Sequence, residues 1–173
     1  MRIILTIFRK ELKSYFISPI AYIFMITFLV FMSWYFFRGF FIVGEASMRS
    51  FFTFIPWIFL FFIPAISMRS WSDENKSGTL AFLLTFPVRD YEVVIGKYLA
   101  SLVLMILTVL GTLPLVMVVN FFGDPDMGPI IGGYLGVILL GSAYLAIGFV
   151  MSLTTKNQII AFIMSLLVCF FRV

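Results

Sequence analysis

Histidine is absent from this sequence, cysteine occurs once, and charged residues make up only 12% of the 173 positions. The absence of histidine removes the commonest general base and the commonest metal ligand. The single cysteine, Cys169, has no partner for an internal disulfide and lies in an apolar run, where we expect a small buried hydrophobic residue. The charged fraction is about half that of an average soluble domain. Together these shortages exclude a soluble enzyme, a disordered chain and a disulfide scaffold.

Apolar residues are what the sequence has instead. They make up 62% of the chain, phenylalanine alone occurs 23 times, and the mean hydropathy is +1.13. A soluble fold of this length buries only about 70% of the surface that its unfolded chain exposes. Such a fold would leave large apolar patches in water. A lipid bilayer is therefore the expected solvent.

Long runs without a charged residue divide the chain into candidate membrane spans. A helix needs about 20 residues to cross the hydrocarbon core. The runs lack the alternating polarity of barrel strands, and a helix satisfies its own backbone in lipid. We predict an all-α membrane protein: residues 1–173 form one polytopic helical bundle, with five spans at about 17–37, 51–68, 98–122, 130–153 and 158–171. The fifth run is short, so we expect a span that is cut off or that continues in residues absent here.

The distribution of Lys and Arg predicts the orientation. With the N-terminus in the cytoplasm, and with Arg172 beyond the fifth run left out of the count, Arg38 and Arg49 lie in outer segments. Nine basic residues then lie on the cytoplasmic side, as the positive-inside rule requires: Arg2, Arg9, Lys10, Lys13, Arg69, Lys76, Arg89, Lys97 and Lys156. We expect a multi-pass protein of the cytoplasmic (inner) membrane. The net charge of +4 is thus explained by orientation in the membrane, and we expect no nucleic-acid partner.

Residues 2–16 are predicted to form an amphipathic helix in the membrane interface. At 100° per residue the basic side chains occupy one arc and face anionic headgroups: Arg2, Arg9, Lys10 and Lys13. Ser18 and Pro19 then break this helix, and Pro19 suits the first turn of the next one. Glu11 projects from the apolar side. Either it pairs with a neighbouring basic residue and reaches water, or it forms a salt bridge to another segment or to a partner.

The longest polar segment, residues 69–97, lies between the second and third spans on the predicted cytoplasmic side. Residues 72–74 suit either a helix start or a charged helical turn, and Gly78 interrupts the pattern. Thr79 can cap a short helix over residues 80–85, and Asp90 can cap the helix that enters the third span.

The short helix of this segment has one apolar edge. Leu80, Leu83 and Leu84 share the i, i+3, i+4 face, and Pro87 ends the helix. Such an edge fits a groove on a soluble partner. The alternative is that the three leucines only lie against the membrane or the ends of the chain's own helices.

The first four spans contain no Asp, Glu, Lys, Arg or His. An ion-coupled transporter would place such groups near the midplane, and a selective channel would need charged rings or a carbonyl filter. The chain also lacks the Gly-x-x-x-x-Gly-Lys-Ser/Thr pattern of ATP-binding loops. We expect no catalytic, cofactor or metal site here, and an energy supply from outside the membrane.

Prolines and glycines within the spans leave alternatives open. Pro56, Pro64 and Pro114 can kink their helices; either neighbouring helices absorb the kinks or the kinks serve as hinges. Gly132 and Gly136 form a small-xxx-small pair in the fourth span. This pair predicts close helix packing, within one chain or between two.

Several motifs in combination resemble the ABC-2 type exporter permeases, in particular the gliding-motility-associated and nitrous-oxide-reductase-maturation branch. The resemblance covers nearly the whole chain and rests on residues 9–22, 74–80, 83–88, 94–97, 128–134 and 153–158. Ala81 departs from the pattern, because the family often has an acidic residue there, and this puts one expected polar contact in doubt. The sixth span of the family is absent from this sequence.

The resemblance implies a permease subunit of an ATP-binding-cassette exporter. In that family the loop between spans two and three is a coupling helix that docks on a separate ATPase subunit, which binds ATP and Mg²⁺. A second permease subunit, identical or different, is also implied. The implied ATPase contacts are Glu74, Gly78, Thr79, Leu80, Leu83, Leu84 and Pro87. The alternative function is a membrane assembly or anchoring protein that transports nothing; an intramembrane enzyme is disfavoured because His and buried carboxylates are lacking.

Overall fold

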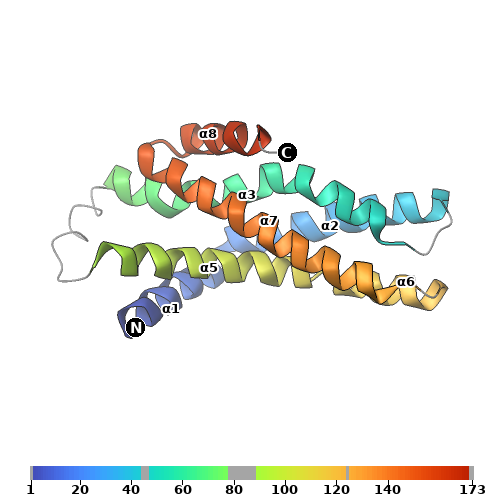
Figure 1. The fold of residues 1–173 in the computed structure, drawn as a ribbon. Coiled ribbons are helices and arrows are strands. Elements are labelled where there is room, and N and C mark those ends of the chain that lie inside the picture. The colour runs from blue at the N-terminus through green and yellow to red at the C-terminus, as the bar shows by residue number, and fades with distance from the viewer. Residues whose placement is uncertain (1, 44–46, 78–88, 124, 172–173) are drawn as a thin grey trace.

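The computed structural model of the chain describes residues 2–43, 47–77, 89–123 and 125–171, and every regular element within these ranges is an α-helix. The predicted all-α class is confirmed. In chain order the helices are α1 (Arg2–Ile17), α2 (Pro19–Val43), α3 (Arg49–Ser77), α5 (Asp90–Leu110), α6 (Leu113–Phe122), α7 (Met127–Thr154) and α8 (Gln158–Phe170), as Figure 1 shows.

Four helical stretches are long and apolar enough to cross a membrane: Ala21–Phe40, Arg49–Met68, Asp90–Phe122 and Met127–Thr154. Helix α8 is apolar as well but has only 13 residues. The chain is therefore a multi-pass membrane protein. In Figure 1, α3 ends and α5 begins at one end of the bundle, which we call the loop end, and α3 and α7 begin at the other, which we call the far end.

Two helix boundaries at the loop end bear on the sequence-based expectations: one decides between two alternatives and the other corrects a predicted cap. Helix α3 continues to Ser77, so residues 72–74 lie in a helical turn, one of the two alternatives, rather than at a helix start. Helix α5 begins at Asp90, and the capping position belongs to Arg89, whose backbone is extended at φ −74° and ψ 134°. Asp90 is thus one residue too late to cap. Its carboxylate lies in the first turn, where it interacts favourably with the helix dipole.

The third crossing is broken in the middle. Helix α5 ends at Leu110 and α6 begins at Leu113, with Pro114 in the first turn of α6, where the missing N–H of proline costs little. Helix α3, by contrast, runs on through Pro56 and Pro64. Of the three prolines considered as kink sites, Pro114 lies next to an interruption of the helix.

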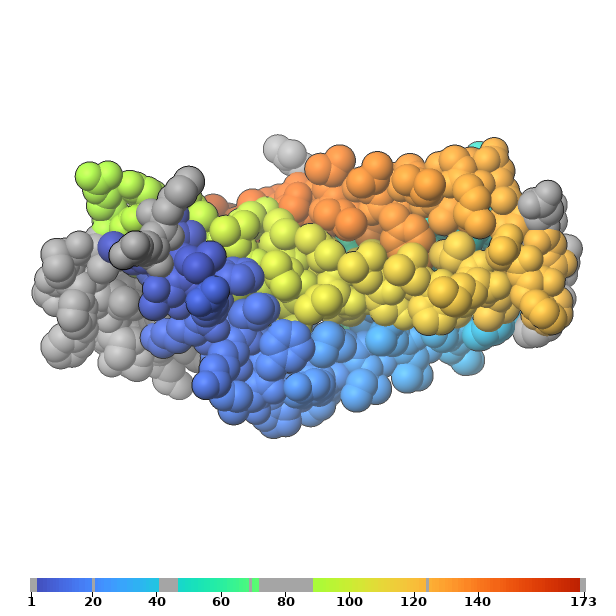
Figure 2. All heavy atoms as spheres, turned by 90° about the horizontal axis from the view of Figure 1, so that it is seen from below, coloured from blue at the N-terminus to red at the C-terminus, as the bar shows by residue number. Residues whose placement is uncertain are grey.

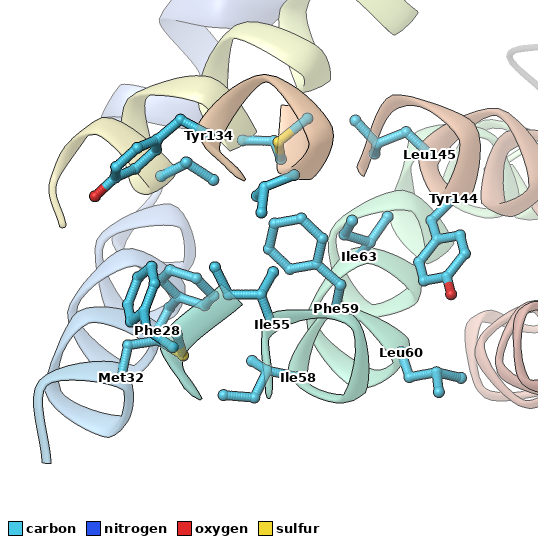
Figure 3. Packing of buried hydrophobic residues seen from close by; sticks show 14 of the residues in the cluster. Phe28, Met32, Ile55, Ile58, Phe59, Leu60, Ile63, Tyr134, Tyr144 and Leu145 are labelled. Atoms are coloured by element: carbon cyan, nitrogen blue, oxygen red, sulfur yellow. The ribbon is translucent and has the colours of Figure 1, made fainter. Parts of the chain in front are cut away.

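The apolar core lies between α2, α3 and α7. Helix α3 occupies the middle, with α7 and α8 as its main neighbours, while α1 packs chiefly against α5. Figure 3 shows side chains of α2, α3 and α7 meeting in one apolar core, in which Phe28, Phe59 and Leu145 are buried. The Phe28 ring meets that of Phe62 edge-on, with centroids 5.4 Å apart, a favoured aromatic geometry.

Glycines set the close approach of α7 to its neighbours. A Cβ atom on Gly141 would lie 2.9 Å from Cε of Met105, and one on Gly148 would collide with Ser67 of α3. Small residues of this kind let helix backbones approach closely. Gly132 and Gly136, the pair singled out in the sequence, have no neighbouring atom within 4 Å of such a Cβ. Their small size is therefore not required by packing within this chain.

Candidate functional site

The candidate site lies at the loop end, where the helices on either side of residues 78–88 meet α1. Figure 2 shows α1, in dark blue, against the first part of α5, in yellow-green. The close approach has a local cause, because a Cβ on Gly96 of α5 would lie 2.9 Å from Cγ2 of Ile7 and 3.2 Å from the carbonyl oxygen of Ile4. The absence of a side chain at Gly96 therefore lets α1 lie directly on α5.

Most of the predicted ATPase contacts lie outside the described residues. Glu74 belongs to the last turns of α3. The others, Gly78, Thr79, Leu80, Leu83, Leu84 and Pro87, fall within residues 78–88, which the structure does not describe. On α1 the basic side chains of Arg9, Lys10 and Lys13 are exposed, whereas Glu11 is half-buried.

Lys97 of α5 forms the centre of the site. Its ammonium Nζ lies 3.2 Å from Oε1 of Glu11 on α1 and donates a hydrogen bond of 3.2 Å to the carbonyl oxygen of Ser70 on α3. It also lies over the ring of Trp71, 5.2 Å from the centroid, where the ring face attracts a cation. Only 6% of the Lys97 side chain and 20% of the Glu11 side chain is exposed. The ammonium group therefore joins three helices in a largely dry environment.

The contact between Glu11 and Lys97 decides between the two alternatives for Glu11. The salt bridge reaches another segment of the same chain, so the second alternative is confirmed. A carboxylate on the apolar side of α1 is stable there because a cation from α5 meets it. The partner, Lys97, was not expected from the sequence, in which it counted as one of nine cytoplasmic basic residues. The position of Glu11 on the apolar face was the available signal.

A second contact between α1 and α5 lies one turn further along both helices. The hydroxyl of Tyr15 is 2.9 Å from Oγ of Ser101 and 3.5 Å from Oγ of Ser70. Ser101 donates to the carbonyl oxygen of Lys97 at 3.2 Å, so Tyr15 is left to donate to Ser101. We call Glu11, Tyr15, Ser70, Lys97 and Ser101 the stem junction, because they join α1 to the end of α3 and the start of α5.

Helix α7 holds the opposite side of α3 at the same level. Oγ of Ser152 accepts a hydrogen bond of 3.2 Å from the backbone N–H of Trp71 and donates one of 3.0 Å to the carbonyl oxygen of Met68. The indole Nε1 of Trp71 is buried and has no hydrogen-bond partner within the part of the chain that the structure describes. The last turns of α3 are thus held in position by contacts with α1, α5 and α7.

The stem junction is suited to transmitting force rather than to covalent chemistry. Its charged groups are paired with each other, its hydroxyls bond to backbone carbonyls or to one another, and all its members lie on rigid helices. A displacement of either helix beside residues 78–88 would therefore be shared with α1 and, through Ser152, with α7. Packed helices with fixed polar contacts carry such coupling.

Comparison with known protein families identifies the family of this chain. The family described as "ABC-2 family transporter protein" matches residues 5–173, which is nearly the whole chain and includes every residue of the stem junction. No curated protein matches the chain.

Proposed function

Because the chain belongs to the ABC-2 family of transporter proteins and is the permease component of an ABC transporter, we propose that it is the membrane subunit of an exporter driven by a separate ATPase subunit. Family membership implies partnership with an ABC ATPase. In this proposal ATP and Mg²⁺ bind in the partner, and two permease subunits, identical or different, form the translocation path. In this proposal the chain belongs to the gliding-motility-associated and nitrous-oxide-reductase-maturation branch of the family.

The proposed orientation places the loop end in the cytoplasm and the protein in the inner membrane. The excess of basic residues on that side supports it. Helix α1 lies in the interface, where its exposed basic residues face anionic headgroups: Arg9, Lys10 and Lys13. With α8 as a further span, the chain crosses the membrane five times.

The ATPase contact is proposed at the 69–97 segment, through Glu74, Gly78, Thr79, Leu80, Leu83, Leu84 and Pro87. Residues 78–88 are the direct link between the last turns of α3 and the first turn of α5. A partner that moves this link therefore moves both helices. An apolar helix edge between charged turns is a common mode of helix-in-groove recognition.

One observation carries the proposal beyond family membership: Lys97 joins Glu11 of α1 to the Ser70 carbonyl of α3. Without this link, movement at residues 78–88 could be lost as separate motions of α3 and α5. With it, α1 and the two helices beside the loop move as one body, and α7 follows through Ser152. ATPase closure would thus tilt several membrane helices together.

Co-purification with a cognate ABC ATPase subunit tests the docking site. The triple substitution L80D/L83D/L84D should abolish co-purification and the vanadate-sensitive ATP hydrolysis that depends on the permease. The matched control is K156D, an added negative charge at the exposed turn between α7 and α8, which should leave both intact. Retained binding in the triple variant would show that the docking site is elsewhere, and ATP hydrolysis independent of the permease would favour a non-transporting anchor.

A further inference from the structure

A cavity of about 540 Å³ opens at the far end of the bundle, away from the stem junction. It lies between the start of α3 and the start of α7, and its volume is within the range of small-molecule sites. Its lining includes Arg49, Phe52 and Thr53 from α3, and Asp126 and Ile130 from the start of α7. The cavity thus combines aromatic and aliphatic walls with one cationic and one anionic side chain.

The apolar wall is held rigidly. The ring of Phe52 meets the ring of Tyr134 edge-on, with centroids 5.3 Å apart. The same ring lies so close to α7 that a Cβ on Gly133 would be 2.6 Å from it. Tyr134 is fixed in turn, because its hydroxyl lies 2.9 Å from Oγ1 of Thr112 at the α5–α6 break. A wall anchored to two other helices is preorganised for a ligand, which lowers the entropic cost of binding.

The two charged groups are positioned by their backbones. The N–H of Arg49 donates to Oγ of Ser47 at 3.2 Å, and its carbonyl oxygen accepts from Oγ1 of Thr53 at 2.9 Å. Oδ1 of Asp126 accepts from the N–H of Gly128 at 3.0 Å and caps α7. Both side chains are exposed, and among the described residues no ion pair joins them. Opposite charges thus line one cavity without neutralising each other.

We propose that this cavity binds a zwitterionic amphiphile, with its anionic group on Arg49, its ammonium group on Asp126 and its apolar chain along Phe52 and Ile130. A purely anionic ligand would gain the guanidinium contact but would meet the repulsion of the Asp126 carboxylate. A zwitterion satisfies both charges at once, and complementary charges of this kind determine specificity. A phosphoethanolamine headgroup on a single acyl chain has this chemistry.

Binding of lysophosphatidylethanolamine to the full chain, purified in a neutral maltoside detergent, tests the assignment. A fluorophore on the acyl chain reports binding, and unlabelled lysophosphatidylethanolamine, lysophosphatidylglycerol with the same chain, and free phosphoethanolamine act as competitors. We expect the zwitterionic lipid to compete best. The free headgroup should compete only at much higher concentration, because it lacks the apolar contacts; equal competition by the free headgroup would overturn the amphiphile assignment.

Two substitutions should give different specificity patterns. R49Q should lower the binding affinity for both lipids by about tenfold, which is the loss expected for one charge-assisted hydrogen bond. D126N should weaken the binding of the zwitterionic lipid alone, to a similar extent. The binding of lysophosphatidylglycerol should be unchanged or tighter, because the carboxylate that repels its anionic headgroup is removed. Asparagine caps helices as well as aspartate does, so the start of α7 is preserved in D126N.

R38Q is the matched control. Arg38 is the other arginine toward the far end of the bundle, but it lies over Trp34, 5.6 Å from the ring centroid, and does not line the cavity. R38Q should bind both lipids like the wild type, whereas T53F should block both by filling the cavity. Three outcomes would each overturn the proposal. They are an equal loss of binding affinity in R38Q and R49Q, an equal loss of affinity for both lipids in D126N, and no binding of either lipid to the wild type. Co-purification with the ATPase is measured on the same variants, so failure here is distinguishable from failure of the proposed function.

Discussion

The carboxylate of Glu11 on α1 and the ammonium group of Lys97 on α5 meet at 3.2 Å, although two predicted spans separate them in the sequence. Both groups are largely buried, since the Lys97 side chain is 6% exposed and that of Glu11 is 20% exposed. A buried pair of this kind adds little net stability, but removal of one member is costly because it leaves an uncompensated charge. The pair therefore determines where α1 lies on α5 more than how stable the fold is.

The first prediction concerns this pair. Replacing Lys97 with Met preserves most of the length of the side chain and leaves Glu11 without its cation. We expect a loss of about 3 kcal/mol in the free energy of unfolding, at the lower end of the usual range because Glu11 is partly exposed. Thermal unfolding in detergent measures it. The double variant E11Q/K97M should recover most of the loss, and a double variant as unstable as K97M would contradict the pairing.

The second prediction concerns the hydroxyl contact one turn further along. Y15F removes the donor to Ser101 and should lower stability by about 1 kcal/mol, the typical net value of a hydrogen bond. Y22F is the control, because Tyr22 is exposed on α2. We expect Y15F, but not Y22F, to reduce the ATP hydrolysis that the permease stimulates in its partner. Equal effects in the two variants would show that the Tyr15 contact has no role in coupling.

The sequence predicted an all-helical membrane protein correctly, and four helical stretches are long and apolar enough to cross a membrane, because uncharged runs of sufficient length have few alternatives in lipid. Positive charges were less informative. Counting placed Lys97 among nine basic residues of the cytoplasmic segments and did not predict its burial beside Glu11. Composition also did not decide between a helix start and a helical turn at residues 72–74. The run of α3 to Ser77 passes through charged residues, which mark the end of an apolar run but do not terminate a helix.

Contacts that depend on the relative placement of two helices could not be read from the sequence. Gly132 and Gly136 have the spacing of a packing motif, yet Gly133, Gly141 and Gly148 are the glycines of α7 that neighbouring side chains approach closely. The rotation of α7 about its axis decides which glycines face α3. That rotation results from packing of the whole core rather than from any local pattern.

The third prediction tests this assignment of the glycines. G148A places a methyl group against Oγ and Cβ of Ser67, so α3 and α7 must separate, and we expect a loss of about 1–3 kcal/mol, as for other overpacked sites. G132A has no atom within 4 Å of the new group and should be neutral or stabilising by up to about 1 kcal/mol through helix propensity. Thermal unfolding compares the two. A destabilising G132A would indicate a contact with another molecule at that surface.

The fourth prediction concerns the break between α5 and α6. Oγ1 of Thr112 donates to the carbonyl oxygen of Val109 at 2.6 Å and also lies 2.9 Å from the hydroxyl of Tyr134 on α7. The Val109 bond uses the only hydroxyl proton of Thr112, so Tyr134 donates to Thr112. T112V would leave the buried Tyr134 hydroxyl without its acceptor, whereas Y134F removes that hydroxyl and leaves the Val109 bond in place.

The two variants should therefore differ in stability. An unsatisfied buried polar group costs about 1–3 kcal/mol, more than the net value of the bond itself, so T112V should be less stable than Y134F. The double variant T112V/Y134F should be no worse than T112V, because the unpaired hydroxyl is gone. Thermal unfolding of the three variants measures this order. If Y134F proves the most destabilised of the three, the Tyr134 hydroxyl is needed to position the ring against Phe52. The α5–α6 break would then be held to α7 through the Tyr134 ring rather than through Thr112.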